Sequence, residues 1–94
     1  MRGRIENAVN LYLIRQSANN DYDTYDSAIV CARDEDDARS IHPGGYDEVV
    51  PLGDSQRDPS GTWTSHNNVK VKLVGVAVEG IERGVLVASS NAGG

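Results

Sequence analysis

Residues Gln16–Pro43, QSANNDYDTYDSAIVCARDEDDARSIHP, lead from the end of one apolar run through a polar turn and a second apolar run into a short acidic helix. Asn and Asp bond their own backbone and tolerate left-handed conformations, so Ala18–Tyr25 is predicted to be a loop. The apolar runs on either side, Asn10–Ser17 and Asp26–Ala32, are predicted to be strands that pair as an antiparallel hairpin. The rest of the fold is expected to build on this hairpin.

A short helix is predicted after the second strand. Asp34 is a good N-cap residue, and the dipole of the helix favours the acidic residues that follow it. Ala38 and Ile41 give this helix a narrow apolar stripe, and Pro43-Gly44-Gly45 is predicted to end it.

The remaining sequence predicts two more strands and one irregular segment. Val69–Val78 begins with alternating apolar and charged residues, which is typical of a strand, and Val85–Ala88 is predicted to be the last strand. Residues 46–68 are rich in Gly, Pro and polar residues and are predicted to be irregular. The chain is therefore expected to form a single α+β domain over residues 1–94. It has about four strands in a mainly antiparallel sheet, with one short helix on one face.

The second face of this sheet also needs a cover. In the first strand, Leu11 and Leu13 point to one side while Tyr12 and Ile14 point to the other. One helix covers one face, so another element must cover the second. The segment 46–68 or another copy of the chain could do so, and we expect a homo-oligomer.

Composition and charge exclude several classes of protein. The 94 residues carry a net charge of −5, which argues against binding to polymeric nucleic acid. Cys31 is the single cysteine and is interpreted as a buried small hydrophobe. One Cys and two His allow neither a disulfide framework nor a Cys/His metal cluster. No apolar run approaches ~18 residues and no signal peptide is evident, so we expect a soluble cytoplasmic protein without a membrane partner.

The predicted loop gathers side chains that can stack, donate or accept. Tyr22 and Tyr25 can stack on a base, and neighbouring amides and carboxylates can read base edges. The structural alternative is that both tyrosines cover an edge of the core. The spacing of Asp21, Asp23 and Asp26 does not match a calcium loop, so no metal site is predicted. The candidate ligand-binding residues here are Gln16, Ser17, Asn19, Asn20, Tyr22, Asp23, Thr24, Tyr25 and Asp26.

Two further candidates lie outside the loop. His42 ends the acidic helix, where the dipole favours a positive imidazole, so a purely structural role also fits it. Trp63 is either a loop anchor or a platform for a ligand. A catalytic triad could be drawn from Ser65, His42 and Asp23, but no nucleophile motif supports it. No catalytic residue is therefore predicted.

Four stretches resemble a widespread set of small phage-encoded proteins. They lie in Tyr12–Ser17, in Asn19–Val30 with its Asn-Asp-Tyr-Asp-Thr-Tyr-Asp run, in Ala38–Pro43 with Ile-His-Pro, and in Gly84–Gly93. The resemblance spans most of the chain and is weak in the irregular segment. Within this set, the chain resembles viral sponge proteins of the anti-CBASS type, which sequester the cyclic nucleotide signals of bacterial anti-phage defence.

The resemblance implies a phage protein that acts in the host bacterial cytoplasm as a homo-oligomer. It implies binding of a cyclic nucleotide, a cyclic dinucleotide above all, without cleavage and without a cofactor. The loop Asn19–Asp26 and the segments around His42 and Asn91 would form the pocket. Because this loop is acidic, cations elsewhere would have to neutralise the phosphates, and the candidates are Arg15, Arg33, Arg39, or Lys70 with Lys72.

A second class of function remains open from the residues. A small acidic phage protein can be a protein-binding inhibitor, such as an anti-CRISPR that imitates the charge of nucleic acid. Its working face would be Asp34–Asp37 with Asp47 and Glu48, although a capped and solvated helix start explains the same residues. Enzymatic activity is the third class and has the least support in the sequence.

Overall fold

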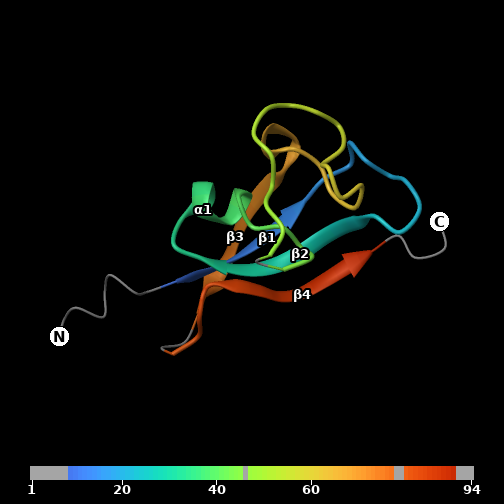
Figure 1. Ribbon diagram of the computed structural model, residues 1–94. Coiled ribbons are helices and arrows are strands. Elements are labelled where there is room, and N and C mark those ends of the chain that lie inside the picture. Colours follow the sequence, from blue (N-terminus) through green and yellow to red (C-terminus); the bar gives the residue numbers. More distant parts are fainter. Residues whose placement is uncertain (1–8, 46, 78–79, 91–94) are drawn as a thin grey trace.

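The computed structural model describes residues 9–45, 47–77 and 80–90, which form one antiparallel sheet and one short α-helix (Figure 1). The four strands lie in the order β3-β1-β2-β4. The elements are β1 (Asn10–Arg15), β2 (Tyr25–Ala32), α1 (Glu35–Arg39), the 3-10 helix η2 (His66–Asn68), β3 (Lys70–Val76) and β4 (Gly84–Ser90). The predicted α+β class, with a four-stranded sheet and one helix, is confirmed.

The predicted hairpin is at the centre of the sheet. β1 pairs with β2 in an antiparallel register that places Leu13 opposite Ile29. The other two strands add at the edges, β3 beside β1 and β4 beside β2, again antiparallel. Every predicted strand is present, with its ends shifted by a few residues.

The core lies on one face of the sheet. Both α1 and the irregular segment pack on this face (Figure 1). The idea that residues 46–68 cover the second face is therefore wrong, because Val50 and Trp63 join the same cluster as the helix residue Ala38. The buried cluster consists of Tyr12, Ile14, Ala28, Val30, Ala32, Ala38, Ile41, Val50, Trp63 and Val69.

The helix begins as predicted and ends early. The Asp34 side chain accepts a hydrogen bond from the Asp37 backbone N–H at 2.8 Å, which confirms the N-cap. The helix ends at Arg39, and Ile41 forms an isolated bridge with Val49. Ile41 therefore contributes to the core from outside the helix, because bridging to the irregular segment replaces a further helical turn. No helix in the described part of the chain is long and apolar enough to cross a membrane.

Candidate functional site

Gln16 closes the base of the loop between β1 and β2. Its side chain is 6% exposed. The amide nitrogen donates to the carbonyl oxygens of Asn19 and Tyr25, both at 2.8 Å, and the amide oxygen accepts from Asn19 N–H at 2.8 Å. One side chain thus satisfies three backbone groups, which fixes where the loop leaves and rejoins the sheet.

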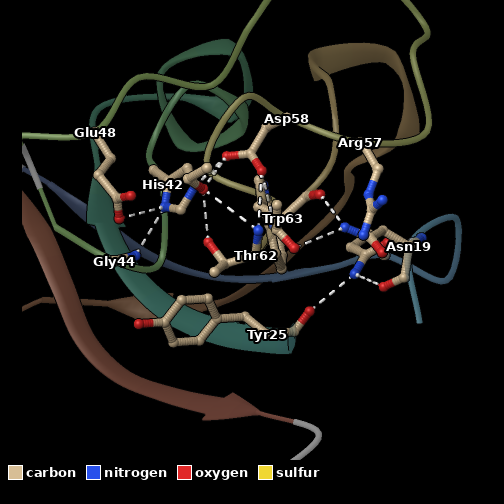
Figure 2. A network of polar contacts seen from close by, with 12 residues as sticks. Asn19, Tyr25, His42, Gly44, Glu48, Arg57, Asp58, Thr62 and Trp63 are labelled. Atoms are coloured by element: carbon tan, nitrogen blue, oxygen red, sulfur yellow. Dashed lines mark hydrogen bonds and ion pairs between the residues drawn. The ribbon is translucent and has the colours of Figure 1, made fainter. Parts of the chain in front are cut away.

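A second set of contacts ties this loop to the irregular segment. The buried Asn19 side chain donates to the carbonyl of Trp63 at 2.8 Å and to that of Gly61 at 3.3 Å. Tyr25 N–H donates to the Thr62 carbonyl at 2.8 Å. At the surface Arg57 pairs with Asp21. The two loops are therefore docked on one another through residues about forty positions apart (Figure 2).

The tip of the loop is a tight turn that exposes Tyr22. Thr24 donates to the Asp21 carbonyl through both its backbone N–H, at 3.2 Å, and its hydroxyl, at 2.8 Å. Asp23 has φ +63°, a conformation that Asp tolerates better than most residues. The Tyr22 side chain is 69% exposed. The turn therefore holds an aromatic ring in solvent on a defined backbone.

Seven of the nine predicted loop candidates divide into two groups, and Tyr25 and Asp26 are described separately below. The side chains of Gln16, Asn19 and Thr24 are buried and serve the loop itself. Those of Ser17, Asn20, Tyr22 and Asp23 are exposed. The enclosed group shapes the loop, whereas the exposed group is accessible to a ligand.

Tyr25 and Asp26 belong to β2, whereas the sequence placed Tyr25 in the loop. The Tyr25 ring is partly buried against the core cluster and meets the His42 ring edge-on, with centroids 6.3 Å apart. Tyr25 therefore packs on the core, as the structural alternative for this tyrosine had it. Asp26 accepts a hydrogen bond from the Ser27 hydroxyl at 3.1 Å.

His42 is 1% exposed and both of its ring nitrogens are engaged (Figure 2). Nδ1 accepts a hydrogen bond from Gly44 N–H at 2.9 Å, so Nε2 carries the proton and its N–H donates a hydrogen bond to Asp58 Oδ2 at 2.6 Å. Glu48 Oε2 lies 3.4 Å from Nδ1. The imidazole is thus a buried link between the segment after α1 and the irregular segment, and it is not accessible to a ligand.

Asp58 organises the irregular segment around this imidazole. Its Oδ1 accepts from the backbone N–H groups of Thr62, at 3.1 Å, and Trp63, at 3.0 Å. Its Oδ2 accepts from the Ser60 hydroxyl at 2.7 Å as well as from His42. Burial would raise the pKa of Asp58, but the hydrogen bonds from Ser60, Trp63 and His42 outweigh it and lower the pKa below its usual range.

Sequence reasoning missed Asp58. The run Asp58-Pro-Ser-Gly-Thr62 carries a signal, since an Asp before Pro and Gly commonly bonds backbone groups a few residues further on. That signal predicts a turn. It gives no indication that the carboxylate also accepts a hydrogen bond from an imidazole sixteen residues away.

The polar cluster does not have the geometry of a catalytic triad. Ser60 Oγ lies 3.4 Å from His42 Nε2, the same nitrogen that bonds Asp58. In a triad the acid and the nucleophile occupy opposite nitrogens of the ring. Ser65, considered above as a nucleophile, is buried.

Trp63 is fully buried, 0% exposed, and its ring lies 6.4 Å from the His42 ring, centroid to centroid. The loop-anchor interpretation is confirmed. Asn91 lies outside the described residues. Cys31 is buried as predicted, and burial raises the pKa of its thiol.

The hollows of the described surface include a groove and a cleft. A groove of about 470 Å³ runs beside the start of β4, and its lining includes Glu48 and Arg83. A cleft of about 250 Å³ lies at the end of β1, lined by Arg15, Gln16, Ser17 and Lys70. The cleft opens where the loop that carries Tyr22 leaves the sheet.

The acidic start of α1 is partly neutralised. Asp37 accepts from Arg83 Nε at 2.7 Å and from Arg33 N–H at 3.0 Å. Asp34 is occupied with the cap. Glu35 and Asp36 remain as exposed acids of the helix start, and Asp47 of the same predicted acidic face is also exposed.

Comparison with known protein families, with characterised proteins and with solved structures finds no match.

Proposed function

We propose that this chain is a phage immune-evasion protein that binds a cyclic dinucleotide in the bacterial cytoplasm and sequesters it without cleaving it. The observation that carries the proposal is the exposure of Tyr22 on a loop whose base is fixed by Gln16 and Asn19. A ring that is exposed but held on an ordered backbone stacks on a base with little further loss of conformational entropy. The resemblance to viral sponge proteins supports the same ligand class.

The proposal of binding without cleavage is based on the burial and the hydrogen bonds of His42. A general base must be within reach of the proton that it removes. The His42 ring is enclosed and both of its nitrogens are occupied by Asp58 and Gly44. Its contacts support a structural role, and they support sequestration over hydrolysis.

A homo-oligomer is part of this proposal, and its physical basis is the second face of the sheet. Leu13, Ile29 and Val87 align across three strands on the face opposite the core. We expect light scattering at micromolar concentration to give a mass well above the 10.1 kDa of one chain, because burying these side chains in a second copy stabilises the assembly. A mass of one chain would contradict this prediction.

Replacing Tyr22 tests the ligand. We expect Tyr22→Ala to weaken binding of a cyclic dinucleotide roughly five- to 150-fold, since loss of one stacked aromatic typically costs about 1–3 kcal/mol. Calorimetric titration against a panel of cyclic dinucleotides measures this. The melting temperature should hardly change, because the ring is exposed.

Two matched variants control this titration. Tyr22→Phe keeps the ring and should restore most of the affinity. Tyr25→Ala should lower the melting temperature, because that ring packs on the core. Ligand recovered intact after heating the complex supports sequestration, and cleaved ligand indicates an enzyme. No heat with any member of the panel would remove the proposal and favour the protein-binding inhibitor.

A further inference from the structure

The strand register builds one polar row across the open face of the sheet. Lys70 of β3 lies opposite Arg15 of β1, Arg15 lies opposite Ser27 of β2, and Ser27 lies opposite Ser89 of β4. The next row on this face is Lys72, Leu13, Ile29 and Val87. The open face therefore changes from a row with three apolar side chains and Lys72 at its edge to a row of two cations and two hydroxyls at the end where the loop begins.

Neither cation of this row forms an ion pair with a described residue, and the Asp26 carboxylate, which reaches the row, accepts a hydrogen bond from the Ser27 hydroxyl. Like charges at directly opposed positions of an antiparallel pair are destabilising. Arg15 and Lys70 are such a pair, both are exposed, and no ion pair within residues 9–45, 47–77 and 80–90 involves either. In a chain of net charge −5, these two neighbouring cations are free of ion pairs with the described residues.

Three other cations are already engaged. Arg39 donates to the Val69 carbonyl. Arg33 lies 3.8 Å from Asp37, and Arg57 pairs with Asp21. Lys72 is exposed in the neighbouring row of the same face, so the cations that form no ion pair in the described residues gather around the end of β1.

We propose that the cleft of about 250 Å³ between Arg15, Gln16, Ser17 and Lys70 binds a phosphodiester of the cyclic dinucleotide. The guanidinium of Arg15 offers paired donors that match two phosphate oxygens, and the ammonium of Lys70 adds a second charge. This inference rests on the proposed function for the identity of the ligand. It places the phosphates on the sheet, away from the carboxylates of Asp21 and Asp23 in the loop.

The same arrangement is compatible with a homo-oligomer. The cation row is at the end of the sheet, whereas the apolar side chains lie in the row beside it. A second copy seated on the apolar row leaves the cleft at the margin of the interface. The phosphates can then reach it from solvent.

Charge removal in the cleft tests this assignment in the full chain. We expect Arg15→Gln and Lys70→Gln each to raise the Kd for the cyclic dinucleotide by about tenfold or more, as loss of a hydrogen bond to a charged group does. Arg33→Gln, which removes one exposed positive charge beside α1, should leave the Kd within about twofold. All three variants should keep the wild-type melting temperature within a few degrees.

A second measurement uses inorganic pyrophosphate as the probe. In a two-dimensional ¹H–¹⁵N spectrum, pyrophosphate should shift the amide resonances of Arg15, Ser17 and Lys70, and the shifts should diminish in Arg15→Gln. Shifts confined to other parts of the chain would overturn the assignment.

The two proposals can fail separately. If a cyclic dinucleotide binds with unchanged affinity to both cleft variants, the phosphate site is wrong and sequestration stands. If no cyclic dinucleotide binds while pyrophosphate shifts the cleft amides, the anion site stands and the proposed ligand is wrong.

Discussion

Asp58→Ala is expected to lower the free energy of unfolding by about 3–5 kcal/mol, because four hydrogen-bond donors lose a charged acceptor and each buried donor left unpaired costs about 1–3 kcal/mol. The carboxylate accepts bonds from the backbone N–H groups of Thr62 and Trp63, from the Ser60 hydroxyl and from His42 Nε2. Alanine leaves these donors without their acceptor, and the His42 ring and Trp63 N–H are buried. Small domains have only about 5–15 kcal/mol of stability, so this loss is severe.

Urea unfolding followed by tryptophan fluorescence measures this change, because Trp63 is the only tryptophan and is fully buried. Asp54→Ala is the matched control, since Asp54 is an exposed residue of the same segment and its removal should change stability by less than about 0.5 kcal/mol. Equal unfolding midpoints for Asp58→Ala and wild type would show that the cluster does not stabilise the fold.

The pH dependence of stability follows from the same carboxylate. Folding lowers the pKa of Asp58 below its unfolded value, which is about 3.9 for Asp. The stabilisation is therefore fully present above the unfolded pKa and is lost as the pH falls through the lower folded pKa. In Asp58→Asn, which cannot ionise, this part of the acid sensitivity should disappear, and unfolding midpoints between pH 5 and about pH 2 measure the difference.

Trp63→Ala is expected to lower the free energy of unfolding by about 3–5 kcal/mol, because the variant loses the buried ring and leaves a cavity. The ring is 0% exposed and joins the core cluster that binds the irregular segment to the sheet. Trp63→Phe should cost less. It keeps an aromatic ring, and the Trp63 Nε1 that it removes has no hydrogen-bond partner within the described residues.

Circular dichroism melting curves measure both Trp63 variants, because they lack the fluorescent reporter. Leu52→Ala is the control, with a side chain of the same segment that is 83% exposed. An equal loss in the Ala and Phe variants would show that the indole makes a contact beyond its packing. No loss in either would contradict the role of Trp63 as the anchor.

Much of the fold could be predicted from local patterns. The apolar runs that became β1 and β2, and the alternation that opened β3, are short-range signals of strand structure. The Asp34 cap is a contact across three residues and was predicted correctly. The loop at Ala18–Tyr25 was predicted from its Asn and Asp content, although its last residue joined β2.

The division of the loop candidates into enclosed and exposed residues could not be predicted, because it depends on partners distant in sequence. Asn19 is enclosed because Trp63 and Gly61 offer carbonyls to it. Tyr22 is exposed in the turn that contains Asp23, the residue with a positive φ. Both are polar-loop residues in the sequence, and nothing local distinguishes their environments.

Local patterns therefore determined the strands, the helix start and the loop, since each depends on hydrogen bonds and apolar periodicity within a few residues. Packing between distant segments determined which face the irregular segment covers, and it brought Asp58 to His42. Strand register set Lys70 opposite Arg15. Register and docking depend on the whole chain. They are set where apolar side chains are buried and where buried polar groups from distant segments find hydrogen-bond partners.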